Sequence, residues 1–217
     1  MGLLTIGEII DGIGQCEGCH LHKHLATECT PTPGHGNSNA DLMFVAEAPG
    51  ENEMLTGIPL VGLAGQLFDK LLDQAGIIRK DCWIDNIVHC RPTEDNKGFK
   101  NRPPTDEEIK ACKGWIWEAI QVVNPKVIVT MGKVPTYTLL HSQLNKTFTM
   151  KSVVGQEFKV DYFPAIIIPV YHPSHLLQHG KKHIDATIDI FKKAKSLLIS
   201  EHDNWANTLP KDKPRKK

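Results

Sequence analysis

The feature that most constrains the fold is a regular alternation of apolar segments with amphipathic ones. Four apolar segments have the length and composition of buried strands. They are residues 41–47, 82–90, 125–132 and 158–174. Segments with the apolar spacing of helices separate or follow them, at 65–77, 105–124, 133–144 and 183–199. Such alternation requires crossover connections between parallel strands. The sequence therefore predicts an α/β fold, a three-layer α/β/α sandwich around a central, mostly parallel four-stranded sheet.

The length of 217 residues suits one domain of this kind. We expect residues 1–200 to form it, with a further helix at 3–13, and residues 201–217 to form a polar, basic tail. A hydrophobic content of 41% and a charged content of 23% are typical of soluble globular proteins. No segment has the length of a membrane span, and the N-terminus lacks the features of a signal peptide. These observations predict a monomer without a membrane partner, cytoplasmic or nucleoid-associated.

The formal net charge is zero, which gives no sign of a polyanionic partner for the molecule as a whole. Basic residues nevertheless cluster at 97–102, at 179–183 and in the tail. Each cluster alone is most simply a solvated surface. A neutral protein can still bind DNA through a local basic face, so DNA remains a possible partner.

Polar residues and a glycine stand where the predicted strands end. Glu47 stands at the end of the first apolar segment in A-E-A-P-G-E-N-E, Asn86 at the end of the strand within the second, Gly132 at the end of the third and His172 near the end of the fourth. The carboxyl edge of a parallel sheet is where ligands bind. Each of these residues alone would more often have a structural role. Their common position predicts a single active site at this edge.

The chain has six cysteines: Cys16, Cys19, Cys29, Cys82, Cys90 and Cys112. The first two form a C-x-x-C motif, and no predicted strand precedes it as in a thioredoxin-like redox pair. With two more thiolates the motif suits either zinc or an iron–sulfur cluster, and the spacing does not separate the two. Cys29 and Cys82 have the simpler interpretation of ordinary thiols.

Together these motifs resemble those of the family 4 uracil-DNA glycosylases, the iron–sulfur branch of the uracil-DNA glycosylase superfamily. They occur in the family's order from about Cys16 to Leu198: CEGCHLHK, ADLMFVAEAPGENEMLTGIPLVGLAGQLFDKLL, DNIVHCRP, NRPPTDEEIKAC, PKVIVTMG and YHPSHLLQ. The resemblance implies a DNA glycosylase. Such an enzyme flips uracil or a related or modified pyrimidine out of DNA and hydrolyses its N-glycosidic bond, leaving an abasic site.

The resemblance also implies roles for the residues at the strand ends. Glu47 would stabilise the cationic sugar or orient water, and His172 would donate a hydrogen bond to the departing base. Asn86 would read the edge of the flipped base. A structural 4Fe–4S cluster is implied on four thiolates, which are Cys16, Cys19, Cys90 and Cys112.

Further implied contacts with the substrate come from the motifs around these residues. The turn that contains Ala48 would form one wall of the base pocket. Pro49, Gly50 and Ser174 would contact phosphates through backbone amides and a hydroxyl. Leu176 would be the wedge that fills the gap left in the base stack.

Three departures from the family leave the substrate open. Leu60 stands where an aromatic residue usually stacks on uracil. The family's Glu-Asp pair reads Glu53-Met54. The link between Cys90 and Cys112 is longer than is usual in the family, with residues 95–100 as the insertion. Phe99 within this insertion is either a substitute for the missing stacking residue or an exposed aromatic residue.

Four hypotheses follow for the function. The first is excision of uracil or a related pyrimidine, and the second is a pocket adapted to a bulkier or modified base. The third is a non-catalytic DNA-binding or replication-associated module, and the fourth is an electron carrier. The joint presence of Glu47, Asn86 and His172 favours a catalytic protein.

Overall fold

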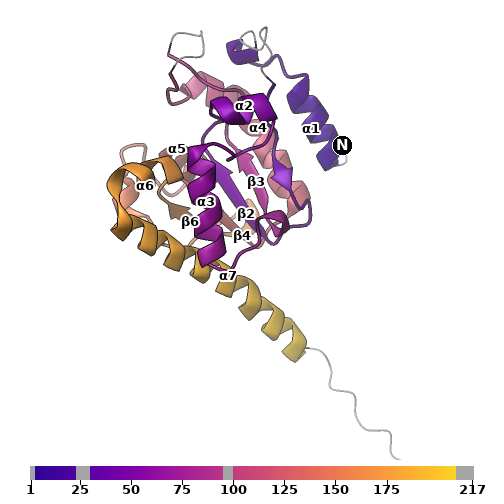
Figure 1. The fold of residues 1–217 in the computed structure, drawn as a ribbon. Helices are drawn as coiled ribbons and strands as arrows, with labels where there is room; N and C mark the ends of the chain where they lie inside the picture. The colour runs from indigo at the N-terminus through magenta and orange to yellow at the C-terminus, as the bar shows by residue number, and fades with distance from the viewer. Residues whose placement is uncertain (1–2, 23–29, 95–99, 209–217) are drawn as a thin grey trace, which may run out of the picture.

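The computed structural model describes residues 3–22, 30–94 and 100–208. Its centre is a six-stranded sheet in the order β1-β3-β2-β4-β6-β5 (Figure 1). The four inner strands are parallel to one another. They are β3 (Trp83–Asn86), β2 (Leu42–Ala46), β4 (Val127–Met131) and β6 (Phe163–Val170). The predicted α/β fold with a mostly parallel sheet is confirmed.

Two antiparallel strands at the sheet edges exceed the predicted count of four. β1 (His35–Gly36) pairs with β3, and β5 (Phe158–Val160) pairs with β6. The first is a two-residue strand in a stretch rich in Pro, Gly and Asn, which has no alternation to reveal it. The second arises because the chain turns at residues 161–162, within the segment predicted as one strand.

Helices cover both faces of the sheet, which gives the predicted three layers (Figure 1). One layer contains α4 (Asp106–Val123) and α5 (Lys133–Leu140), with α1 (Ile6–Gly14) packed on α4. The other contains α3 (Leu63–Gln74), α6 (Pro173–His179) and α7 (Lys181–Thr208). Because side chains alternate along a strand, β2 contributes Met43 to the first layer and Phe44 to the second.

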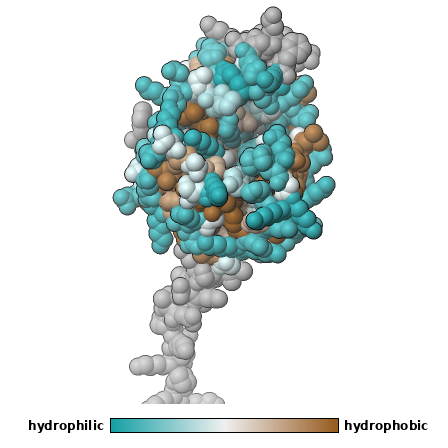
Figure 2. Space-filling view, turned by 90° about the vertical axis from the view of Figure 1, so that its left-hand side faces the viewer, coloured by the Kyte–Doolittle hydropathy of each residue, from teal (hydrophilic) through white to brown (hydrophobic). Residues whose placement is uncertain are grey.

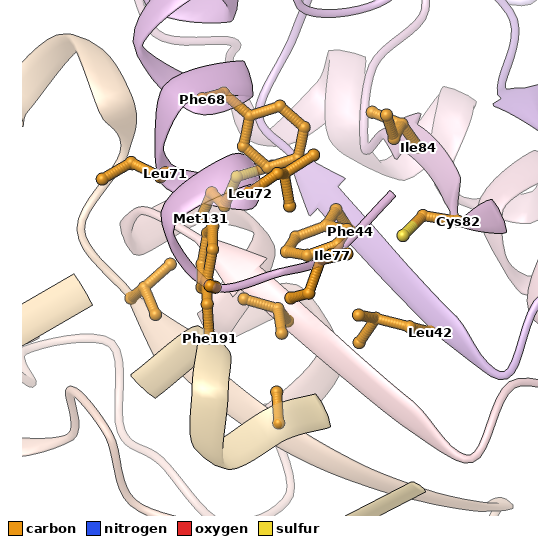
Figure 3. Packing of buried hydrophobic residues seen from close by; sticks show 14 of the residues in the cluster. Leu42, Phe44, Phe68, Leu71, Leu72, Ile77, Cys82, Ile84, Met131 and Phe191 are labelled. Atoms are coloured by element: carbon orange, nitrogen blue, oxygen red, sulfur yellow. The ribbon is translucent and has the colours of Figure 1, made fainter. Parts of the chain in front are cut away.

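Three fully buried phenylalanines join the second helical layer to the sheet (Figure 3). Phe44 of β2 meets Phe68 of α3 and Phe191 of α7 edge to face, with ring centroids 4.9 and 5.1 Å apart. Such aromatic pairs contribute about 0.5–1.5 kcal/mol each beyond the burial of their area. This packing holds α3 and α7 against β2, whose carboxyl end leads into the predicted site.

Several short elements complete the fold. α2 (Glu51–Thr56) begins directly after the A-E-A-P-G turn, and two 3₁₀ segments lie at Arg79–Asp81 and Met150–Ser152. α7 continues beyond the predicted domain end at residue 200 and reaches Thr208, and its last turns extend away from the sheet in Figure 1. The rest of the predicted tail, 209–217, lies outside the described residues. Of the helices described, none is both long enough and apolar enough to span a membrane.

Candidate active site

A cleft of about 270 Å³ opens at the carboxyl edge of the sheet. Segments that follow β2, β3 and β6 meet there. Of the residues predicted for the site, the cleft is lined by Ala48, Gly50, Leu60, Asn86, His172 and Ser174. Glu47, Pro49 and Leu176 do not line it. The structure thus brings together residues that are distant in the sequence, as expected for strand ends on one sheet edge.

His172 lies at the N-terminal cap of α6, and its ring is held by Ser174. The backbone N–H of Ser174 donates to Nδ1 over 3.2 Å, and the Ser174 hydroxyl lies 2.6 Å from the same nitrogen. A backbone amide can only donate, so Nδ1 accepts and the neutral ring carries its proton on Nε2. Burial lowers the pKa of His172 to about 4, although the negative charge of Glu53 opposes that shift. At neutral pH the ring is therefore uncharged, with its N–H at Nε2.

Asn86 is the last residue of β3 and is only 2% exposed. Its backbone N–H donates to the carboxylate of Asp85. Among the described residues, none forms a hydrogen bond with its side-chain amide. Buried polar groups are nearly always hydrogen-bonded, so a buried amide that lines a cleft without a partner is suited to bind a ligand.

Glu47 follows β2 and lies beside the cleft without lining it. Its backbone carbonyl accepts from the N–H of Val88 over 3.1 Å, which ties the ends of β2 and β3 together. Burial raises the pKa of its carboxyl group. Within the part of the chain that the structure describes, no side-chain or backbone group forms a hydrogen bond with that carboxylate. A partly desolvated carboxylate of this kind is a stronger base than an exposed one.

Glu53 organises the wall of the cleft that contains Leu60. Its carboxylate accepts from the backbone N–H groups of Gly50, Val61 and Gly62 over 3.0, 2.9 and 2.8 Å. Between these anchors, Leu60 has a φ of 54°, in the left-handed region that non-glycine residues rarely adopt. Such strain persists where the surrounding structure imposes it, often at functional sites.

Sequence reasoning treated Glu53 only as part of a departure from the family. The signal that could have identified it is its position three residues after Gly50, the spacing at which a glutamate caps the start of a helix. Asn101 was also missed as a lining residue. It accepts from Nε of the buried Arg91 over 2.6 Å, a contact across the loop that sequence spacing does not reveal.

Leu176, the predicted wedge, is 1% exposed and packs in the core with α3 and α7. Its burial corrects that prediction, because a core side chain cannot enter DNA without disrupting the fold. The neighbouring Leu177 is 53% exposed. Figure 2 views the side on which α6 lies in Figure 1, and small apolar patches stand there within a mainly hydrophilic surface.

The four predicted ligand thiols line one cavity between α1, β3 and α4. They are Cys16, Cys19, Cys90 and Cys112. Burial, together with the charges of the other three thiols, raises the pKa of Cys90 to about 12. In the described ranges no group of three or more His, Cys, Asp or Glu side chains is arranged to hold a metal ion.

Backbone amides point at two of the sulfurs in this cavity. Gly18 N–H lies 3.4 Å from Cys16 Sγ, and His89 N–H lies 3.4 Å from Cys112 Sγ. Four thiols around one cavity, with N–H groups directed at two of the sulfurs, match the ligand type of thiolate-held iron–sulfur clusters. The residues present therefore fit such a group.

Other predictions concern residues away from these two sites. Cys82 is buried, and its burial raises the pKa of the thiol to about 12, as expected for an unreactive thiol. Cys29 lies outside the described residues. So do Phe99 and all of the 95–100 insertion except Lys100.

A sheet-edge cleft lined by strand-end residues, in an α/β/α sandwich, is the arrangement that the resemblance to DNA glycosylases predicts. The family model described as the uracil DNA glycosylase superfamily matches residues 33–198, and the chain belongs to this superfamily. The predicted resemblance and enzyme class, that of the DNA glycosylases, are thereby confirmed.

Curated relatives extend the similarity over nearly the whole chain. A type-4 uracil-DNA glycosylase of Saccharolobus solfataricus is 33% identical over 206 residues, which cover 93% of this chain and 90% of that protein. The type-4 enzyme of Archaeoglobus fulgidus is 32% identical, with 87% and 91% covered. That of Thermotoga maritima is 33% identical, with 89% and 94% covered.

Proposed function

We propose that this protein binds DNA and excises uracil by hydrolysis of the N-glycosidic bond. The observation that carries the proposal is the buried, unpaired side-chain amide of Asn86 in the same cleft as His172. An amide offers one acceptor and two donors. That combination matches the adjacent carbonyl and N–H groups on the edge of a uracil flipped out of the duplex.

His172 supplies the hydrogen bond to the departing base. Cleavage places negative charge on the uracil ring, and the Nε2–H of a neutral histidine can stabilise that charge without first losing a proton. Removal of one preorganised donor of this kind typically costs about 2.7–4 kcal/mol of transition-state stabilisation. The contact of Ser174 with Nδ1 keeps the proton on the required nitrogen.

Glu47 acts on the sugar side of the bond. Burial raises the pKa of its carboxyl group, which makes the carboxylate a better base for orienting a water molecule, while its negative charge favours the cationic sugar. Its place beside the cleft, rather than in the lining, suits a group that contacts the sugar and water instead of the base. Pro49 lies between Glu47 and Gly50, and this turn would contact phosphates of the DNA backbone.

Leu60 gives the base pocket an aliphatic wall. Its side chain is 6% exposed, lines the cleft and packs in the core at the same time. Uracil would therefore contact an apolar surface without the base–aromatic stacking worth about 1–3 kcal/mol. A pyrimidine with a larger substituent is the alternative substrate that this smaller side chain would admit.

Leu177 is the proposed wedge in place of Leu176. Apolar wedges from DNA-binding proteins insert between base steps. Leu177 combines 53% exposure with a position five residues after His172, on the helix that begins at the cleft.

Cys16, Cys19, Cys90 and Cys112 are proposed to hold a 4Fe–4S cluster with a structural role. Excision of a base requires no electron transfer. When bound, the cluster would supply covalent cross-links between the segment after α1, the segment after β3 and α4. Protein purified without oxygen should be brown and contain about four irons per chain. Colourless protein with stoichiometric zinc would contradict the cluster.

A panel of oligonucleotides tests the activity. Single- and double-stranded DNA, each with one uracil or one modified pyrimidine, is incubated with the protein, and abasic sites are then cleaved with alkali. We expect cleavage at uracil, with loss of activity in His172→Ala and Asn86→Ala. Cleavage that persists in His172→Ala, or that occurs only at modified bases, would contradict excision of uracil by this site.

A further inference from the structure

A buried polar chain connects the thiol cavity with the residue proposed to read the base. Its centre is His89, which is 1% exposed and lies on the segment after β3. Ring Nδ1 lies 3.2 Å from Cys112 Sγ, and ring Nε2 lies 2.9 Å from Asp85 Oδ1. The imidazole therefore spans a predicted cluster ligand and a buried carboxylate.

Asp85 continues the chain to the base pocket. It is 1% exposed, and its Oδ1 also accepts the backbone N–H of Asn86 over 2.8 Å. Its second oxygen accepts the indole N–H of Trp83 over 3.0 Å. Each of these hydrogen bonds ends on a rigid group, either backbone or an aromatic ring, so the carboxylate has little freedom to move.

The alternation of side chains along β3 explains why such a link is needed. Trp83 packs in the layer that contains α4 and the thiol cavity, whereas Ile84 packs in the opposite layer. By the same alternation Asp85 belongs with the first and Asn86 with the second. The carboxylate of Asp85 thus fixes, from the thiol side, the backbone of the residue that lines the cleft on the other side.

We propose that His89 is a positioning residue that couples the thiol cavity to the base pocket. Its Nδ1 side stabilises the sulfur of Cys112, and its Nε2 side holds Asp85 and thereby the backbone of Asn86. This inference rests on the proposed uracil excision and on the proposed cluster, and it makes His89 a residue that supports both. Partners of this kind typically change metal retention or activity by about 10- to 100-fold when removed.

Two conservative variants separate the two sides of the ring. In His89→Asn the amide nitrogen can take the place of Nδ1 near Cys112 but does not reach Asp85. In His89→Gln the longer side chain can place its amide near Asp85, in the position of Nε2. His89→Leu removes both contacts, and His141→Asn, at the exposed end of α5, is the control for the substitution itself.

The variants are compared as purified holoproteins by iron release to a chelator, reduction potential and uracil excision. We expect His89→Gln to release iron about 10- to 100-fold faster and to shift the potential, which hydrogen bonds to sulfur help to set. His89→Asn should retain iron like the wild type but lose about tenfold or more in kcat/KM on uracil DNA. Its affinity for DNA with an abasic site, which presents no base to Asn86, should be unchanged.

The outcomes distinguish a failure of this inference from a failure of the proposed uracil excision or of the proposed cluster. A wild type without uracil excision or without iron refutes the proposed function or the cluster, before any variant is made. With both present in the wild type, identical defects in His89→Asn and His89→Gln would overturn the coupling. Wild-type iron retention and kcat/KM in a folded His89→Leu would overturn it too. If His89→Leu does not fold, the other two variants still decide.

Discussion

Replacement of Glu53 by glutamine should loosen the wall of the cleft that contains Leu60. The carboxylate accepts three backbone N–H groups: Oε1 accepts from Val61 and Gly62, and Oε2 from Gly50. A glutamine can retain the two bonds to its carbonyl oxygen, but its NH₂ group then faces the N–H of Gly50. One hydrogen bond to a charged acceptor is lost, which corresponds to about 1.5–3 kcal/mol of unfolding free energy.

The effect on activity follows from the lost bond to Gly50, which ties the side chain that holds the strained Leu60 to the A-E-A-P-G turn. A non-glycine residue at a φ of 54° is costly, and the bonds from Val61 and Gly62 to Glu53 hold it there. If the same 1.5–3 kcal/mol must be recovered when the base binds, kcat/KM on uracil DNA should fall roughly 10- to 150-fold. Glu53→Ala would leave three donors without an acceptor and is expected to unfold, so glutamine is the informative change.

Urea unfolding and steady-state kinetics, at a temperature where the variant is fully folded, measure the two effects. Glu51→Gln is the stability control, because Glu51 is a largely exposed neighbour whose ion pair with Arg91 spans 3.7 Å and contributes little. Leu60→Gly in the Glu53→Gln background should recover part of the lost stability, since glycine accepts a positive φ without strain. An unchanged urea midpoint together with an unchanged kcat/KM in Glu53→Gln would refute the role of Glu53 in holding the cleft wall that contains Leu60.

Further predictions concern Glu47, Leu60 and the two neighbouring leucines of α6. The kcat should fall as the pH falls through the raised pKa of Glu47, before His172 gains a proton near pH 4. A pH profile without this limb in Glu47→Gln would confirm that Glu47 is its source. Because burial in the fold disfavours the ionised form of Glu47, Glu47→Gln should have a higher urea midpoint than the wild type at pH 7. A lower midpoint would contradict the buried position of the carboxylate. Leu60→Phe should raise uracil excision about 5- to 150-fold by stacking, whereas unchanged activity would place Leu60 away from the base. Leu177→Ala should lower excision from duplex DNA more than from single strands, while Leu176→Ala should cost about 2–5 kcal/mol of stability, and the reverse pattern would restore Leu176 as the wedge.

Much of the fold could be predicted because its information is local. Apolar runs that end in polar residues mark the inner strands, and helical spacing marks the layers that cover them. The rule that parallel strands end at one sheet edge then brings Asn86 and His172 into one site without knowledge of any contact. The C-x-x-C spacing identified Cys16 and Cys19, and the resemblance to the family added Cys90 and Cys112, although the spacing left the metal open.

The residues that the sequence misplaced depend on contacts between distant segments. Leu176 and Leu177 are equally apolar neighbours, and only the docking of α6 against α3 and α7 determines which one is buried. The two-residue strand β1 exists because β3 offers it an edge, since so short a segment has no stable strand structure by itself.

What the sequence by itself determined is the order of the elements, the layers and the identity of the strand-end residues, because periodicity along the chain specifies which side chains must be buried. The tertiary structure alone decided how those residues are held. The three amides on Glu53 and the link from Cys112 through His89 to Asp85 join segments whose approach depends on the packing of the complete sheet. Hydrogen bonds act over about 3 Å, so no pattern along the chain specifies them until the fold has brought their atoms together.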